Sequence, residues 1–326
     1  MNLPTVPFSP VQASTLAGQV DLLYLYLIAV SVFFTCVIFA TVLFFTLKYK
    51  RRSETERPEA IHGNLLLEIT WSAIPLAIAM TMFTWGSILY FKGWRAPQNA
   101  EEIFVVGKQW MWKIQHPEGR REINELHVPV DHPIRLKMTS EDVIHSFFVP
   151  AFRVKMDVVP GRYTSLWFQP TKTGRYHLFC AEYCGTKHSG MIGWVTVMPE
   201  EEYQQWLETG TAIAPVTVSG KELFQKNRCN TCHHAESGAL GPDLAGVFGN
   251  PVQLADGRTV TADENYIRES IVKPNAKIVA GYTPMMPTFQ GQLGEEEILQ
   301  IISYLKSLKA ETGTPETAAP PASPAA

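Results

Sequence analysis

The stretch CAEYCGTKHSGM, residues 180–191, places two thiols, an imidazole and a thioether on one short loop. Copper prefers these donors, and a mononuclear blue-copper site would use only one of the two cysteines. The second cysteine therefore predicts two copper ions that share both sulfurs, with a further histidine brought from elsewhere in the chain. A disulfide between Cys180 and Cys184 is the alternative, but it would leave His188 and Met191 without a role. The period-two alternation of RYHLF at 175–179 would bring Cys180 to the end of a strand, and metal ligands often gather there on loops that a rigid sheet holds.

Short segments rich in Val, Ile, Phe, Tyr and Trp lie on both sides of this loop. The turn sequences PEG at 117–119, PGR at 160–162 and KTG at 172–174 separate them. This pattern predicts an antiparallel sandwich or barrel of about 100 residues. We place this domain at residues 92–209, with a short helix over Pro199–Thr209 at its end. The expected strands lie within Ile103–Ile114, Ile134–Met138, Thr164–Phe168 and Met191–Val197.

Two long uncharged segments precede the β domain. Leu22–Leu47 and Ile69–Phe91 each exceed the roughly 20 residues that a helix needs to cross a bilayer, so residues 22–91 predict a transmembrane hairpin. No Lys or Arg precedes the first segment, which argues against a signal peptide. The connection between the segments is basic and is therefore expected to face the cytoplasm, because it contains Lys48, Lys50, Arg51, Arg52 and Arg57.

This charge distribution predicts the location of the rest of the chain. The N-terminal segment 1–21 contains no Lys or Arg, so it is expected on the outer side, together with everything after Phe91. We therefore expect a protein of the bacterial cell (inner) membrane that crosses it twice. Both termini and all cofactor domains would lie on the periplasmic or outer side.

After the β domain, the pattern changes from strands to helices. Residues 210–219 are small and apolar and contain proline; they predict a linker, and a tether of about ten residues would span roughly 20 Å as a random coil. Helices are expected at Gly220–Asn227, Asp263–Lys273 and Glu295–Lys309, so residues 220–309 predict a small α domain. Residues 310–326 are mostly Ala, Pro, Thr and Glu and are expected to be disordered.

Within this α domain, CNTCH at residues 229–233 matches the attachment sequence of c-type haem. In that sequence two thiols, here Cys229 and Cys232, bind the porphyrin, and the histidine, here His233, ligates the iron. The alternative is a zinc site made from the same residues and His234. Structural zinc sites draw their ligands from two separated segments, however, and no Cys or His follows His234, so haem is favoured.

The iron then needs a sixth ligand, which the thioethers of Met285 and Met286 could supply. In this region the chain resembles class I cytochromes c. The sequence GPDL at 241–244 is similar to the family's segment beside the haem, and Met286 precedes Pro287 as the family's axial methionine precedes a proline. The resemblance implies that Met286 is the ligand and that Met285 is a packing residue.

The copper loop resembles the binuclear CuA loop of cytochrome c oxidase subunit II. The resemblance implies that the second histidine is His145, within DVIHSF at 142–147, and KMDVVPGR at 155–162 is also similar to the family. It implies that the backbone carbonyl of Glu182 binds copper and that the Glu182 side chain reaches a magnesium at the border with subunit I. The implied fold is a cupredoxin-like Greek-key sandwich, with His145, Cys180, Glu182, Cys184, His188 and Met191 as copper ligands.

Two further positions match the same family. QWMW at 109–112 is similar to the aromatic patch that accepts electrons, with Trp110 in the matching place, although Met111 departs from the usual aromatic and a tethered cytochrome could dock elsewhere. EITW at 68–71 puts Glu68 where the family has a carboxylate at the proton-channel entrance. From position alone, Glu68 could equally be a charge that snorkels at a helix end. Fusion to a cytochrome places the chain with the caa(3)-type oxidases.

The resemblance implies electron transfer from a donor through haem c to CuA and on to haem a of subunit I, where oxygen is reduced to water and protons are pumped. The implied cofactors are two copper ions, one covalent haem c and a shared magnesium. The implied partners are subunits I and III, membrane lipid, and a donor such as a cytochrome c or a quinol-oxidising complex. Nucleic acid is not expected as a partner, because the net charge is -3 and the pI is near 6.3.

Three other functions are alternatives to this one. A stand-alone membrane electron carrier would have the same two centres without an oxidase partner. A nitric-oxide or nitrous-oxide reductase component could also use CuA, but nitrous-oxide reduction needs a His-rich copper cluster, and most of the nine histidines are assigned elsewhere. A copper sensor would have no use for two cysteines that bind haem.

Overall fold

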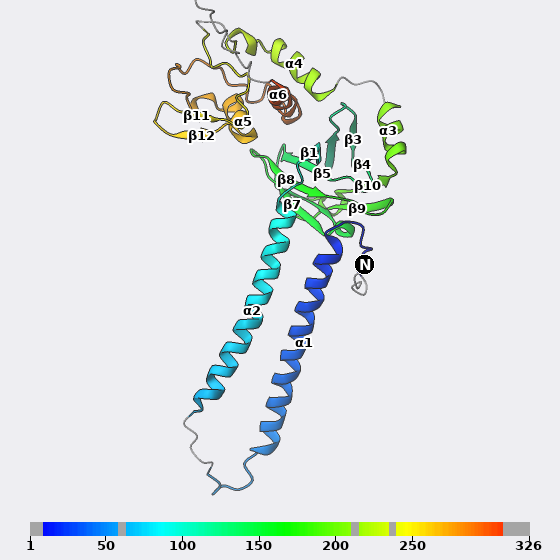
Figure 1. Ribbon diagram of the computed structural model, residues 1–326, viewed down its shortest axis with the longest axis vertical. Coiled ribbons are helices and arrows are strands. Elements are labelled where there is room, and N and C mark those ends of the chain that lie inside the picture. Colours follow the sequence, from blue (N-terminus) through cyan, green and yellow to red (C-terminus); the bar gives the residue numbers. More distant parts are fainter. Residues whose placement is uncertain (1–8, 58–62, 210–214, 235–238, 309–326) are drawn as a thin grey trace, which may run out of the picture.

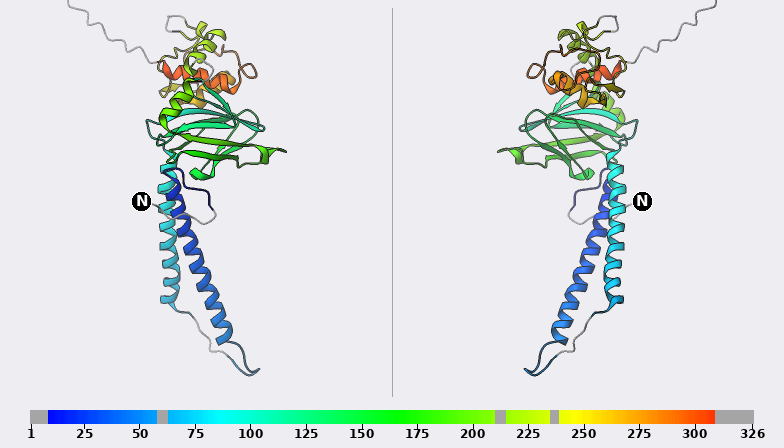
Figure 2. Two further views of the ribbon diagram at one scale, coloured as in Figure 1. Left: turned by 90° about the vertical axis from the view of Figure 1, so that its right-hand side faces the viewer. Right: turned by 90° about the vertical axis from the view of Figure 1, so that its left-hand side faces the viewer.

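The computed structural model describes residues 9–57, 63–209, 215–234 and 239–308. The chain forms three parts in a row: two long helices, a β-sandwich, and a small helical domain on the side of the sandwich away from the helices (Figure 1). Both side views keep this order (Figure 2). The expected tail 310–326 and the first eight residues lie outside the described residues, as do 210–214 of the expected linker.

The two N-terminal helices are α1 (Ala17–Lys48) and α2 (Leu65–Trp94). Both are long and apolar enough to cross a membrane, and none of the most apolar window of either helix is buried within the protein. Asn64 begins α2, because its side chain accepts a hydrogen bond from the amide of Leu67, which satisfies one of the free donors at a helix start. Helix α1 begins within the expected outer segment 1–21, since its first turn packs on the sandwich, where Leu16 and Ala17 are buried.

The sandwich consists of two five-stranded sheets, ordered β3-β2-β1-β5-β8 and β4-β10-β9-β6-β7. Two pairs, β1 with β5 and β4 with β10, are parallel, so the expectation of a purely antiparallel domain is wrong. The paired strands are not consecutive in the chain, and the intervening chain returns to the same end of the sheet before the second strand begins, so both strands run in the same direction. The strands are β1 (Glu101–Lys108), β2 (Met111–Gln115), β3 (Arg121–Ile123), β4 (Glu125–Pro129), β5 (Ile134–Ser140), β6 (His145–Val149), β7 (Val154–Val158), β8 (Thr164–Phe168), β9 (Gly174–Cys180) and β10 (Ile192–Met198).

A single apolar core fills the space between the two sheets. Its largest fully buried side chains include Trp112, Phe147, Phe152 and Phe168. Short 3-10 turns, η1 (Pro150–Phe152) and η2 (His188–Gly190), connect strands at the edges. Helix α3 (Glu200–Glu208) follows the last strand, and its first turn carries Glu200, Glu201 and Glu202, which complement the helix dipole.

The helical domain begins earlier than expected. Helix α4 (Val216–Lys226) starts inside the expected linker, because Val216 is buried and its amide donates to the carbonyl of Pro117 on the sandwich. Helix α6 crosses α4 at Gly220, where an added Cβ would lie 2.0 Å from the carbonyl oxygen of Gln300. The remaining elements are η3 (Cys229–Thr231), β11 (Pro251–Gln253), β12 (Thr259–Thr261), α5 (Glu264–Val272), η4 (Pro274–Ala276) and α6 (Glu295–Ser307).

Candidate metal and haem centres

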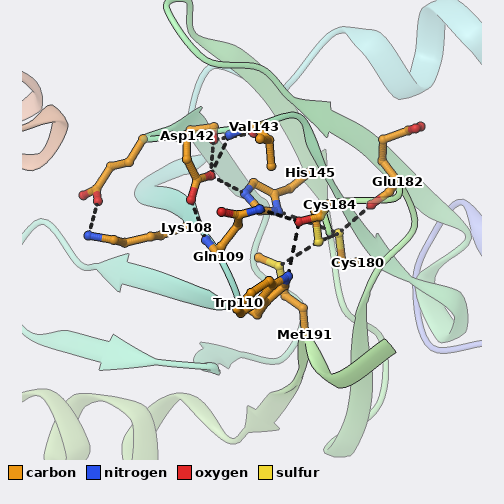
Figure 3. A network of polar contacts seen from close by, with 12 residues as sticks. Lys108, Gln109, Trp110, Asp142, Val143, His145, Cys180, Glu182, Cys184 and Met191 are labelled. Carbon is orange, nitrogen blue, oxygen red and sulfur yellow. Dashed lines mark hydrogen bonds and ion pairs between the residues drawn. The ribbon is translucent and has the colours of Figure 1, made fainter. Parts of the chain in front are cut away.

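Sulfur and nitrogen atoms of His145 on β6 and of the loop at residues 180–191 lie close together in the sandwich domain. Figure 3 shows Cys180, Cys184, Met191 and His145. The sulfurs of Cys180 and Cys184 lie 3.8 Å apart and form no disulfide. The Nδ1 of His145 lies 3.9 Å from the Cys180 sulfur, and the Nδ1 of His188 lies 3.5 Å from the Cys184 sulfur. The thioether sulfur of Met191 is 3.8 Å from the Cys184 sulfur. These donors suit copper in type, and their spacing leaves room for ions between them.

The two thiols differ in how readily they ionise. Burial opposes ionisation of Cys180, but its hydrogen bond with His145 and its backbone contacts outweigh burial and lower the pKa to about 6. Burial and the negative charge of Cys180 raise the pKa of Cys184 to about 12. Cys180 therefore ionises first, and a cation shared by both sulfurs would be needed to hold Cys184 as a thiolate at neutral pH.

His145 is held from behind by a carboxylate. Its Nε2 lies 2.8 Å from Oδ1 of Asp142, which leaves Nδ1 facing Cys180. Asp142 also accepts hydrogen bonds from the amides of Gln109 and Val143, each 2.7 Å long, and these bonds lower its pKa despite partial burial. A carboxylate behind a metal-binding imidazole fixes the orientation of the ring.

The remaining residues expected at this end lie around the same loop. The carbonyl oxygen of Glu182 is 3.2 Å from the Cys180 sulfur, whereas the residue itself is exposed. The indole nitrogen of Trp110 donates to the carbonyl of Cys184 at 3.2 Å, and the side chain of Gln109 donates to the same oxygen at 2.7 Å. Glu68 lies far from this loop, in the first turn of α2 at the other end of the hairpin.

A second centre lies in the helical domain, where a cavity of about 390 Å³ is lined mostly by apolar side chains. Its wall includes Cys229, Cys232 and His233 on one side and Met286 on another. The Nδ1 of His233 is 2.8 Å from the carbonyl of Pro242, so Nε2 remains available to an iron atom. A cavity of this size and lining, with these four residues on its wall, fits a covalently bound haem.

The backbone beside His233 explains the Gly-Pro sequence at 241–242. A Cβ on Gly241 would lie 2.7 Å from Cε1 of the His233 ring, which is closer than carbon atoms can approach. Glycine therefore allows the following carbonyl, that of Pro242, to reach the ring nitrogen. The same contact favours haem over zinc, because it holds His233 as a single oriented ligand rather than as one of four clustered donors.

The two methionines differ in position. Met286 packs against the apolar cluster of the helical domain, whereas the side chain of Met285 is 61% exposed. Met285 also lines the haem cavity, so the expectation that it is a packing residue stays a prediction. The position of Met286 is compatible with an axial ligand.

Comparison with known proteins decides the family. The family model described as "Cytochrome C oxidase subunit II, periplasmic domain" matches residues 121–197, and the one described as "Cytochrome c" matches residues 217–309. Over 289 residues, 84% of this chain and 82% of the relative, the sequence is 30% identical to cytochrome c oxidase subunit 2 of Alkalihalophilus pseudofirmus. The chain belongs to the cytochrome c oxidase subunit 2 family.

A second relative matches over a similar length, and a solved structure matches over a shorter one. Cytochrome c oxidase subunit 2 of Bacillus subtilis is 28% identical over 306 residues, which cover 83% of each chain. The crystal structure of the periplasmic domain of subunit II of Bradyrhizobium japonicum cytochrome oxidase covers 35% of this chain and 96% of its own, with 35% identity and a TM-score of 0.34. The family models and the relatives confirm the resemblance to subunit II with a cytochrome c domain. The two long apolar helices, the cupredoxin-like sandwich and the helical domain are confirmed as well.

Two residues near the copper loop of this subunit II were missed as contributors by the sequence analysis. Asp142 stands three residues before His145, and this spacing could have identified it as the partner of the ring. Gly107 gives no such signal, although an added Cβ there would lie 2.9 Å from the His145 ring. Its close approach depends on the packing of β1 against β6, which no local pattern shows.

Proposed function

We propose that this subunit II carries a binuclear CuA centre and one haem c, and that it passes electrons from the haem to the coppers. The copper ligands in this proposal are His145, Cys180, the carbonyl of Glu182, Cys184, His188 and Met191. Cys229 and Cys232 bind the haem covalently, and His233 and Met286 ligate its iron. The observation that carries the proposal is the convergence of two thiols, two imidazoles and a thioether at 3.5–3.9 Å in one loop region.

In the intact oxidase, a donor such as a cytochrome c or a quinol-oxidising complex would reduce the haem, and CuA would pass electrons to haem a of subunit I. Oxygen reduction to water and proton pumping belong to that subunit, and subunit III would complete the complex. The exposed carboxylate of Glu182 would reach a magnesium at the border with subunit I. Glu68, in the first turn of α2, would supply a proton-channel entrance on the cytoplasmic side.

The membrane placement follows from the same proposal. Helices α1 and α2 would cross the bacterial inner membrane, with the basic connection after Lys48 in the cytoplasm. Both termini, the sandwich and the helical domain would then lie on the periplasmic side, where thioether-linked haem is assembled.

Metal analysis and spectroscopy of the purified complex test the proposal. We expect two coppers and one haem c iron per copy of this chain, with a c-type haem band and near-infrared absorption from mixed-valence copper. Met191→Leu should change the copper spectrum and leave the haem band intact, whereas Met198→Leu, at the end of β10 that lies away from the loop, should change neither. Zinc in place of copper, or a haem change in the Met191 variant, would overturn the assignment. A complex without haem a would instead indicate a stand-alone electron carrier.

A further inference from the structure

The helical domain rests on the outer surface of the β3-β2-β1-β5-β8 sheet (Figures 1 and 2). Alternate residues of these strands point away from the sandwich core and meet helices α5 and α6. We call this surface the docking face, and it comprises Glu102, Phe104 and Val106 of β1, Lys113 and Gln115 of β2, and Lys137 of β5.

A chain of alternating charges crosses the docking face. Glu264 of α5 pairs with Lys137 at 2.7 Å and with Lys306 of α6 at 2.9 Å, and Lys306 also pairs with Glu102 at 2.9 Å. The side chains of Lys137 and Glu264 are only 6% and 15% exposed. Charges buried to this extent are tolerated only when they are paired. The helical domain and the sandwich therefore form a specific interface with each other. Salt screens such pairs much less than it screens exposed ones.

Apolar and backbone contacts complete the interface. Phe104 and Val106 belong to the same buried cluster as the apolar side chains of α5 and α6. The amide of Tyr163 donates to the side chain of Asn265 at 2.7 Å, and Arg268 donates to the carbonyl of Gly161 at 2.9 Å. These contacts fix the helical domain in one orientation, which a flexible tether alone would not do.

Strand β1 joins this interface to the copper loop. Phe104 and Val106 face the helical domain, whereas Ile103 and Val105 face the sandwich core. Gly107, which follows Val106, lies against the ring of His145, where an added Cβ would be 2.9 Å from Cδ2. One peptide unit therefore separates a residue in contact with the cytochrome domain from a residue in contact with a proposed copper ligand.

Helix α6 lies on the other side of the interface. Its Leu305 lines the haem cavity, and its Leu299 lines a small interface cavity together with Phe104 and Val106. Trp110 lies elsewhere: its hydrogen bond to Cys184 and its ring contact with Lys187 stay within the copper domain, and none of its interactions with described residues reaches the helical domain.

We infer that the cytochrome domain is a fixed relay on the docking face, and that its electron enters the copper centre through α6, β1 and His145 instead of through Trp110. The inference rests on the proposed function. One electron leaves ferrous haem, which becomes ferric, and the oxidised copper pair takes it up. Because the domain does not have to move, transfer would depend little on viscosity or ionic strength.

Charge reversal at the docking face tests this route in the complete oxidase. Lys306→Glu places a third carboxylate beside Glu102 and Glu264, and we expect the flash-induced rate from haem c to CuA to fall about tenfold or more. The double variant K306E/E102K restores one pair and should recover part of the rate. Lys221→Glu makes the same charge change on the exposed side of α4 and should leave the rate unaltered. A normal rate in K306E would overturn the inference.

Two further measurements separate docking from the route. Zero-length carbodiimide coupling should join Lys137 to Glu264 and Lys306 to Glu102, identified as linked peptides, and the coupled oxidase should keep its intramolecular rate. Loss of the rate on coupling would mean that the domain must move.

Trp110→Phe distinguishes the routes, because it should slow electron transfer through the indole but not electron transfer along β1. A large loss of the rate from haem c to CuA with an unchanged copper spectrum would refute the β1 route. Absence of the haem or copper spectrum in the unmodified protein would instead refute the proposed function.

Discussion

Asp142 ties the His145 side of the copper site to the first sheet. It accepts hydrogen bonds from His145 on β6 and from the backbone of Gln109, and Gln109 in turn donates to the carbonyl of Cys184. The position of the His145 ring therefore depends on a residue that does not itself face the sulfurs. A loop of flexible ligands becomes a rigid site because such contacts fix it from outside.

Asp142→Asn should weaken copper binding without unfolding the sandwich. The amide keeps the shape of the side chain but loses the charge that holds His145 with Nδ1 toward Cys180. We expect copper affinity to fall roughly 10- to 100-fold, measured by competition with a copper chelator. Asp131→Asn, in the turn between β4 and β5, makes the same change away from the site and should bind copper normally. Equal affinities in the two variants would contradict this role.

Glu264 makes docking of the cytochrome domain dependent on pH. Burial raises the pKa of Glu264, but the charges of Lys306 and Lys137 outweigh it and bring the pKa to about 2, below the ordinary value of 4.5. A lowered pKa gives stabilisation that is complete above pH 4.5 and is lost as the pH falls toward 2. Lys306 lies in the same domain as Glu264, so docking accounts only for the share that comes from Lys137 and from burial at the interface, which is less than the roughly 3 kcal/mol of the whole shift.

The Tyr163 amide reports this equilibrium, because its hydrogen bond to Asn265 crosses the interface. Its protection from hydrogen exchange should fall as the pH drops below 4.5. In Glu264→Gln the protection should already be low at pH 7 and should not fall further. Glu269→Gln, on the same helix but paired with Lys277 within its own domain, should behave like the unmodified protein. A pH-independent protection in the unmodified chain would contradict the prediction.

Among the elements, the sequence predicts those whose pattern is local. The expected strand Thr164–Phe168 is β8, and the expected helix from Glu295 is α6. Their period-two and helical patterns can be recognised from the segment's own sequence, without knowing which residues pack against it. The segment Ile103–Ile114 instead forms two strands. Helix α4 begins at Val216, within residues expected to be linker, because its first residue is stabilised by contact with Pro117. Such tertiary contacts leave no periodic signal.

The same limit applies to the sites. Most of the copper and haem residues could be proposed because they lie in two short motifs, residues 180–191 and 229–233. His145 and Met286 lie outside these motifs and are singled out only by the family resemblance. The docking face could not be predicted from the sequence, because Glu102 and Lys137 alternate with apolar residues in the same way as charged residues that face solvent. Only their pairing with Glu264 and Lys306 in the folded chain distinguishes them from ordinary solvent-exposed charged residues.

The crossing of α4 and α6 depends on Gly220. A side chain at this position would collide with the backbone of Gln300, at 2.0 Å from its oxygen and 2.7 Å from its carbon. Gly220→Ala should therefore separate the helices and destabilise the helical domain by about 1–3 kcal/mol. Chemical denaturation followed at the haem absorption band would measure this. Gly294→Ala, in the same domain and with only the Glu297 side chain near its Cβ position, should cost much less; equal losses would contradict the steric explanation.

At the scale of the whole molecule, each of the two outer parts is joined to its neighbour by a charged contact. The cytochrome domain is held on the sandwich by Lys306 and Glu264. The sandwich is held on the helix hairpin by Arg153, which binds both oxygens of Asp21 at 2.8 and 2.9 Å, and by the Trp167 indole, which donates to the carbonyl of Lys92. This continuity from the bilayer to the haem is what a fixed electron route requires.

Asp21→Asn tests the joint at the membrane. Arg153 is only 12% exposed and Asp21 only 5% exposed in their side chains, so removing the carboxylate leaves a largely buried cation without its partner, a change that typically costs 3–5 kcal/mol. The amides of Ala13 and Thr15, which donate to the carbonyls of Ala151 and Gln169 across this joint, should then exchange on the order of 100-fold faster. Copper binding, at the far side of the sandwich core, should persist. If the two amides kept their protection in the variant, the hydrogen bonds and apolar contacts of this joint would hold the helix hairpin without the ion pair, and the sandwich would not need Asp21 to keep its orientation on the hairpin.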